Sequence, residues 1–302
     1  MELRHLRYLI AVAEEGHITR AAERLDMQQP PLSRQIRIIE REVGTALFRR
    51  KPRGVELTDA GRAFLDGARQ ILATLNVTLE TTRRTARGEQ GRISVGSTNG
   101  AVLNPFVPRI IREFRDAFPL VSVSLIESYS NDLVDRIRNS QIDIAFIRTS
   151  IPASEEMVVD LLHNEPEVVA LPVRHALAPR KGRSDAPLSL KDLAAETFLA
   201  FGGPQGRLTM QGNALIAACE QAGFSPRVNP VASNSIPRLS LVAAGLGIAV
   251  LPASVQRVGI EGVVYRRLKN ASQPLNLVSR RGDTSALIRQ FVKLAKRTTK
   301  GS

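Results

Sequence analysis

The apolar residues in the N-terminal part of the chain have the spacing of short amphipathic helices. Leu6 and Leu9 share one face of a helix that we expect from about residue 3 to residue 14. A second, shorter helix is expected over residues 20–25, with Thr19 as its N-terminal cap. The pattern therefore predicts a small helical domain at the start of the chain.

Pro30 and Pro31 mark the start of a third helix, because proline is tolerated only in the first turn of a helix. Leu32 and Ile36 then lie on a core face, and polar side chains such as Arg34 point away from it. A helix of this kind is suited to the major groove of DNA, where its N-terminal N–H groups and side chains meet phosphates and base edges.

Residues 47–58 have the pattern of two short strands around a Pro-Arg-Gly tip, which predicts a β-hairpin wing. From Arg34 to Arg53 there are seven basic and two acidic residues, a net charge of +5 that favours contact with phosphates. The alternative is a small helical domain with a solvated basic face. The residues that we expect at DNA are Thr19, Gln29, Pro30, Pro31, Ser33, Arg34, Arg50 and Arg53.

Residues 59–86 contain no proline, and their leucines recur at intervals of three and four. This is the a/d seam of a coiled coil, and pairing with a second copy of the chain would bury it. The alternative is a helix that packs on its own domain. We expect a linker helix over residues 59–87, a hinge at 88–91, and a dimerisation seam that includes Leu65, Leu72, Leu75 and Leu79.

Short β-rich runs alternate with helical stretches in the rest of the chain. Strands are expected at 93–95, 121–125 and 142–147, with helices at 104–118 and 131–139 between them, which predicts a parallel βαβαβ unit. A second set of strands is expected at 167–171, 197–201, 227–231 and 247–251, with helices at 208–222 and 237–244. Late strands at 263–268 and 275–279 and a helix at 284–297 return to the first lobe. We therefore expect lobe I over residues 92–161 and 266–302, and lobe II over 162–265.

Ligands of open parallel sheets bind at the carboxyl ends of the strands, where loops meet helix N-termini. Loops rich in small hydrogen-bond donors follow several of the expected strands, and Arg148 follows the third strand directly, where it could pair with an acid. The alternatives are ordinary helix capping by the loops and an internal salt bridge for Arg148. The residues expected to bind a ligand are Ser97, Thr98, Asn99, Gly100, Ser130, Arg148, Gly202, Asn234 and Ser235.

Composition narrows the class of protein. The 302 residues are 43% hydrophobic and carry a formal net charge of +13, which favours a polyanionic partner. The single cysteine, Cys219, cannot form an intramolecular disulfide or a cysteine-based zinc site. There is no signal-peptide pattern and no apolar run long enough for a bilayer, so a cytoplasmic protein without a membrane partner is expected.

Other functions have less support in the sequence. The histidines His5, His17, His163 and His175 lack metal-ligand spacing, and neither a Gly-x-Ser-x-Gly elbow nor a Gly-x-x-x-x-Gly-Lys loop occurs, so an enzyme is not expected. A solute receptor without DNA function would need an export signal. A sequence-independent DNA-coating protein would not need a sensor-like second half or a helix with polar reading residues.

Several motifs together resemble the LysR-type transcription regulators: Thr19-Arg20-Ala21-Ala22-Glu23-Arg24-Leu25, Gln29-Pro30-Pro31-Leu32-Ser33-Arg34-Gln35-Ile36, Leu57-Thr58-Asp59-Ala60-Gly61 and the run from Leu241 to Pro252. The resemblance implies an all-α winged helix-turn-helix over residues 1–58, with the helix-turn-helix itself at about 18–37, followed by the linker helix. It implies a C-terminal α/β effector domain of two Rossmann-like lobes, similar to periplasmic solute receptors.

The same resemblance implies a set of partners. They are double-stranded promoter DNA, a second copy of the chain in a homodimer or homotetramer, a small-molecule effector and RNA polymerase, with no cofactor besides this co-inducer. The opening residues also resemble the branch of bacterial regulators that controls the degradation of aromatic compounds. That branch and the donor-rich loops lead us to expect a small organic acid as effector.

Overall fold

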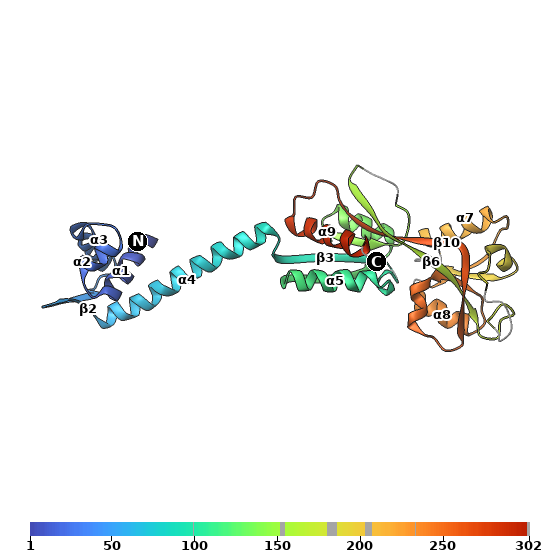
Figure 1. Ribbon diagram of the computed structural model, residues 1–302, viewed down its shortest axis with the longest axis horizontal. Helices are drawn as coiled ribbons and strands as arrows, with labels where there is room; N and C mark the ends of the chain where they lie inside the picture. The colour runs from blue at the N-terminus through green and yellow to red at the C-terminus, as the bar shows by residue number, and fades with distance from the viewer. Residues whose placement is uncertain (99, 152–154, 180–185, 203–206, 233, 301–302) are drawn as a thin grey trace. The chain divides into compact units, whose positions relative to one another are not determined.

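The computed structural model describes residues 1–98, 100–151, 155–179, 186–202, 207–232 and 234–300. The chain forms two compact units, Met1–Arg84 and Thr85–Ser302, each with its own elements (Figure 1). Among the residues that the structure describes, no helix combines the length and the apolar character that crossing a bilayer requires.

The N-terminal unit contains the three predicted helices, the predicted hairpin and all but the last turn of a long helix. Its elements are α1 (Leu3–Glu15), α2 (Ile18–Arg24), α3 (Gln29–Val43), β1 (Phe48–Lys51), β2 (Gly54–Leu57) and α4 (Asp59–Arg87). The double proline lies in the first turn of α3, as expected. The buried core of this unit consists of Leu9, Ala11, Val12, Ala21, Ala22, Leu32, Ile36, Ile39, Leu47 and Leu65.

The prediction that Thr19 caps the second helix is wrong. His17 is the N-terminal cap of α2, and its ring Nδ1 accepts a hydrogen bond of 3.2 Å from the backbone N–H of Thr19. An imidazole nitrogen thus does what a hydroxyl oxygen was expected to do, and the helix begins two residues earlier than predicted. Thr19 lies exposed in the first turn of α2.

The wing is fastened to the helices by backbone and side-chain hydrogen bonds. β1 and β2 pair antiparallel, with Lys51 opposite Gly54 at the tip. The Glu40 carboxylate of α3 accepts hydrogen bonds from the N–H groups of residues 47 and 48, at 2.8 and 3.0 Å. A Cβ atom at Gly54, whose φ is +135°, would collide with the carbonyl oxygen of Gly16, so only glycine permits this approach of the wing to α1.

The C-terminal unit is built on a six-stranded sheet of order β4-β3-β5-β10-β6-β9 and a two-stranded sheet of β7 and β8. The strands are β3 (Gln90–Thr98), β4 (Leu120–Ser128), β5 (Ile144–Ile147), β6 (Met157–Pro172), β7 (Thr197–Phe201), β8 (Arg227–Ala232), β9 (Ala249–Pro252) and β10 (Val263–Arg280). The helices are α5 (Phe106–Ala117), α6 (Ser130–Arg138), α7 (Met210–Gln221), α8 (Ser235–Ala243) and α9 (Ala286–Lys300), with short 3-10 turns η1 (Ala101–Leu103), η2 (Leu190–Leu193) and η4 (Ala253–Val258).

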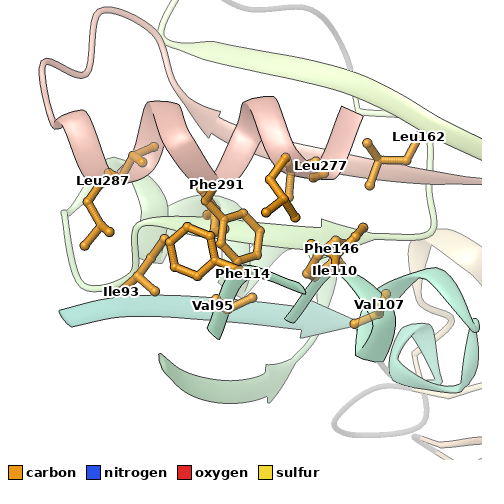
Figure 2. Close-up of a cluster of buried hydrophobic side chains, with 14 of the residues drawn as sticks. Ile93, Val95, Val107, Ile110, Phe114, Phe146, Leu162, Leu277, Leu287 and Phe291 are labelled. Carbon is orange, nitrogen blue, oxygen red and sulfur yellow. The ribbon is translucent and has the colours of Figure 1, made fainter. Parts of the chain in front are cut away.

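Lobe I has the predicted βαβαβ arrangement. β3 pairs in parallel with both β4 and β5, and α5 and α6 are the crossover helices. The C-terminal helix α9 returns to this lobe, where the rings of Phe291 and Phe114 lie 4.8 Å apart between their centroids. Figure 2 shows these two rings meeting next to Ile93 and Val95 of β3. Helix α9, from the C-terminal end of the chain, thereby completes the core of lobe I, whose first strands come much earlier in the sequence.

The expected short strands at 167–171, 263–268 and 275–279 are parts of two much longer ones. β6 and β10 pair antiparallel over almost their whole length, with irregularities between Arg267 and Ser272 and between Leu275 and Asn276. Leu268 belongs to the core of lobe II and Leu275 to that of lobe I, so β10 changes lobe after the expected boundary at 265/266. The sequence does not indicate this continuity, because polar residues interrupt the alternation of apolar and polar side chains. Each strand stays extended because its backbone pairs with the other strand.

Lobe II is assembled around the far ends of these long strands. β9 pairs antiparallel with β6, and β7 pairs in parallel with β8. A parallel bridge between Phe198 of β7 and Ile248, the residue before β9, brings the two-stranded sheet next to β9. The second set of strands is therefore mixed in direction and not a repeat of the parallel unit in lobe I.

Candidate functional site

The exposed face of α3 presents basic side chains. Leu32, Ile36 and Ile39 are buried, and they turn the arginines of the same helix outward. An open groove on this face is lined by Arg34, Arg37, Glu40, Arg41, Gly44, Thr45 and Ala46. None of the ion pairs between described residues involves Arg34 or Arg37, so both guanidinium groups are available to phosphates or base edges.

The wing divides its charges between internal pairs and free cations. Arg49 and Lys51 both form ion pairs with Glu56 on the opposite strand. Arg50 and Arg53 are exposed and take part in no ion pair among the described residues. The prediction selected these same two residues, and the pairing around Glu56 gives the physical reason why they, and not their neighbours, remain free for a phosphate.

The other residues expected at DNA lie on the surface of the same unit. Gln29, Pro30 and Pro31 are exposed in the first turn of α3, and Ser33 is half-buried. These four residues therefore lie near Arg34 at the N-terminal end of α3.

The expected dimerisation seam is only partly available on α4. Leu65 is buried in the core of its own unit. The first turns of α4 therefore pack on their own domain, which is the alternative to pairing with a second chain. Leu72 and Leu75 are half-buried, and 46% of Leu79 is exposed. The later turns of α4 therefore carry uncovered apolar surface at Leu79 of the seam, and also at Val77 on the opposite side of the helix, which is 65% exposed.

The loops expected to bind a ligand come together in two small groups. The Thr98 hydroxyl accepts a hydrogen bond from the N–H of Arg148 at 3.2 Å, and the hydroxyls of Thr149 and Ser130 lie 3.2 Å apart. In the second group, a Cβ atom at Gly100 would lie 3.2 Å from the Ser235 hydroxyl. The two lobes thus meet at Gly100 and at the start of α8.

The remaining expected ligand residues differ in what they can offer. Ser97 is fully buried, and its hydroxyl donates to the carbonyl of Thr98 at 3.1 Å. The Asn234 side-chain oxygen, at the cap of α8, is buried and has no hydrogen-bond partner among the described residues. Gly202 follows β7 and forms a bridge with Leu208. Asn99 lies outside the described residues.

Arg148 forms a buried ion pair, which is the alternative that the sequence left open. Its Nη2 donates to the Glu165 carboxylate of β6 at 2.7 Å, and both side chains are almost completely buried. Glu165 also accepts hydrogen bonds of 2.6 Å from the Asn104 side chain and from the N–H of Ser254. Because Asn104 and Arg148 lie in lobe I and Ser254 in lobe II, Glu165 links the lobes. Within the described part of the chain, the Nε and Nη1 atoms of Arg148 have no hydrogen-bond partner.

A cavity of about 430 Å³ lies beside this ion pair. Of the described residues expected to bind a ligand, Arg148 alone lines it. Its other walls come from β6, β7, α7, α8, β9 and the irregular part of β10. Residues that the sequence-based prediction missed here include Glu167, Phe201, Gln211, Arg238, Asn270 and Gln273. The sequence does single out Arg238, because it is the one charged residue in α8.

Cys219 lies in α7 with none of its surface exposed, and burial, followed by the charge of Glu220, raises the pKa of its thiol to about 11. Roughly one thiol in ten thousand would be ionised at pH 7, so the nucleophilic form is scarce. We expect a thiol-specific dye to react only after unfolding, and peroxide to change the DNA affinity of neither the parent nor Cys219→Ser. A peroxide response that is lost in Cys219→Ser would assign this thiol a sensory role.

Comparison with known proteins covers nearly the whole chain. Residues 3–62 match the family described as bacterial regulatory helix-turn-helix protein, lysR family, and residues 86–300 match the LysR substrate binding domain. The chain is 35% identical to the transcriptional regulator AlsR of Bacillus subtilis (strain 168), over 98% of this chain and 95% of AlsR. It is also 35% identical to the regulator CatR of Pseudomonas putida, over 97% of this chain and 98% of CatR.

Solved structures agree with this assignment. Full-length CbnR in complex with its target DNA is 28% identical, with a TM-score of 0.85, over 99% of this chain and all of that chain. Full-length BenM is 30% identical, with a TM-score of 0.60, over all of this chain and 96% of that chain. These relatives are regulators and not enzymes, and the expected winged helix-turn-helix with a two-lobed α/β effector domain is confirmed. This chain belongs to the LysR family of DNA-binding transcriptional regulators.

Proposed function

We propose that this protein binds promoter DNA through α3 and the wing, as a homodimer or homotetramer whose chains pair through α4, and that a small organic acid bound in the C-terminal unit controls transcription. The observation that carries the proposal is the face of α3. It presents Gln29, Ser33 and Arg34 after a double proline, in a chain that aligns along its length with a DNA-bound regulator. A protein that acts on bacterial promoters in this way would work in the cytoplasm and would contact RNA polymerase there.

The reading role of α3 can be separated from general attraction to DNA. Arg34 is exposed at the start of α3, where base edges are within reach, and Arg53 is exposed at the tip of the wing. Arg34→Ala should weaken binding to a specific site by about 1–3 kcal/mol and relax its specificity at one position. Arg53→Ala should weaken specific and random DNA similarly, because phosphate contacts carry no sequence information.

The experiment begins with selection of bound fragments from the source genome by the full-length protein. The selected operator and a shuffled duplex of the same composition are then titrated by fluorescence anisotropy at two salt concentrations. Equal losses on both duplexes for Arg34→Ala would remove this residue from the base-reading set. A parent protein that binds the selected and shuffled duplexes equally would contradict sequence-specific regulation.

The effector part of the proposal is tested by mass spectrometry of ligand that co-purifies with the protein. The compound is then added back in a transcription assay with the selected promoter. A small acid that changes transcript levels supports the proposal. A neutral or cationic effector would contradict the organic-acid assignment and leave the DNA-binding function in place.

A further inference from the structure

Arg238 has unused hydrogen-bond donors in the interior of lobe II. Its side chain is only 1% exposed, and its Nη2 donates to the carbonyl of Val250 at 3.0 Å. Its Nε and Nη1 have no hydrogen-bond partner among the residues that the structure describes. The guanidinium carbon lies 3.8 Å from the centroid of the Phe201 ring, which holds the planar group in place through a cation–π contact. The guanidinium group of Arg238 is therefore fixed in position, and its Nε and Nη1 remain available as donors to a ligand.

The charge of Arg238 also lacks a direct counter-ion. Arg238 takes part in none of the ion pairs between described residues, whereas Arg148 in the same cavity is paired with Glu165. Burial lowers the pKa of Arg238 to about 9, with Glu167 acting in the opposite direction, so the group is still a cation at pH 7. Because burying an unpaired charge is costly, a cation kept in this state favours an anion as its partner.

Glu167 is the acidic group that shares the cavity. Its carboxylate accepts a hydrogen bond of 2.5 Å from the side chain of Gln273. Burial raises the pKa of Glu167, against the opposing effects of Gln273, Arg148 and Arg238. Glu167 therefore takes up a proton at a higher pH than an exposed glutamate does. Among the described ion pairs, Arg148 is joined to Glu165, whereas Arg238 is joined to no carboxylate.

The rest of the cavity offers apolar surface along α7. Met210, Ala214, Leu215 and Ala218 line the cavity from successive turns of this helix. Leu190 and Pro274 add apolar surface from other elements. A volume of about 430 Å³ falls in the range of pockets that hold small organic molecules. The cavity thus combines the Arg238 guanidinium with an apolar wall against which a hydrocarbon group can pack.

We infer that this cavity is the binding subsite for a monocarboxylate with an apolar body, whose carboxylate accepts hydrogen bonds from Arg238 and whose body packs against α7. A carboxylate oxygen can accept a charge-assisted hydrogen bond from Nε or from Nη1, which point to different sides of the guanidinium. This inference rests on the proposed function, because it names the class of acid and the residue that holds it. It moves the counter-ion role from Arg148, which is already paired, to Arg238, which is not.

The test uses the full-length protein in a buffer free of carboxylate and phosphate. Acetate, pentanoate and benzoate are titrated by calorimetry, each beside its matched amide, together with pentanedioate and 5-aminopentanoate. Pentanoate or benzoate should bind, and the corresponding amide should bind at least about tenfold more weakly, because it lacks the charge that Arg238 attracts. Tighter binding of the diacid or of the amino acid than of pentanoate would overturn the monocarboxylate assignment, as would the absence of binding by every acid.

Two variants assign the subsite to its residues. Arg238→Met should weaken binding of the acid at least about tenfold and leave the amide unchanged. Arg227→Met is the matched control, since Arg227 is exposed at the start of β8 and does not line the cavity. Thermal unfolding checks that both variants fold. Unchanged acid binding by folded Arg238→Met would overturn the role of Arg238.

Ala218→Leu fills the apolar end of the cavity without changing a charge. It should weaken benzoate or pentanoate more than acetate, and equal effects on short and long acids would contradict the packing of the body on α7. The outcomes also separate this inference from the proposed function. If a co-purified acid still regulates transcription through folded Arg238→Met, the effector function stands and the subsite lies elsewhere. If no acid alters transcription by the parent protein, the proposed control by an organic acid fails as well.

Discussion

Glu165→Gln is expected to lower the free energy of unfolding of the C-terminal unit by roughly 3–5 kcal/mol. The carboxylate of Glu165 is buried with the Arg148 guanidinium at 2.7 Å, and it also accepts hydrogen bonds from Asn104 and Ser254. Glutamine keeps the shape of the side chain but leaves the Arg148 charge without its counter-ion. Removal of one partner from a buried pair is costly because the other charge has already lost its water.

The pH dependence provides a second readout for this pair. Burial works against the ionised form of Glu165, but the charge of Arg148 and the hydrogen bonds from Ser254 and Asn104 outweigh it and hold the pKa of Glu165 below its usual value. A lowered folded-state pKa stabilises the protein at any pH above the unfolded-state pKa, about 4.3 for glutamate, and this contribution is lost as the pH falls through the folded-state value. The stability difference between the parent and Glu165→Gln should therefore shrink in acid.

Urea unfolding followed by circular dichroism measures both effects, since the chain contains no tryptophan. Glu156→Gln is the matched control, because Glu156 pairs with Arg138 at the surface and 67% of its side chain is exposed. That change should cost at most about 1 kcal/mol. Arg148→Met combined with Glu165→Leu should recover much of the lost stability, because no unpaired charge then remains. A loss below about 1 kcal/mol for Glu165→Gln would contradict the assigned role of the pair.

Leu72→Glu combined with Leu79→Glu should halve the mass of the assembled protein and weaken operator binding by roughly 100- to 10,000-fold. This loss of affinity equals the avidity that a dimer gains by binding DNA with two linked DNA-binding units in place of one. The later turns of α4 carry uncovered apolar surface, and paired helices would bury four glutamates at facing positions. Light scattering and operator titration measure the two effects, with a single chain of 33.0 kDa as reference.

Gln70→Glu combined with Thr74→Glu is the control for added charge. Both residues are exposed on α4, on the side of the helix away from the leucine seam, and they introduce the same two negative charges. This control should keep the parent mass and most of its DNA affinity. Parent-like mass and affinity in the leucine double variant would show that the leucine seam of α4 does not pair the chains.

Features that depend on neighbouring residues could be predicted without a structure. The double proline predicted where α3 begins, and the absence of proline over residues 59–86 predicted the long helix α4. Alternating strands and helices predicted the parallel unit of lobe I. In each case the determining feature is local: either a restriction on the backbone or the periodicity of a helix or strand. Such features can be recognised from residues that are close together in the sequence.

Features that depend on distant partners could not be predicted in the same way. Nothing near Arg148 in the sequence indicates that Glu165 neutralises it, because β10 separates their strands in the sheet. β6 and β10 remain extended through their polar stretches because each supplies the other's backbone partners. The free donors of Arg238 depend on which elements surround α8. Long-range packing therefore determines which charges in this chain are paired and which are left for a ligand.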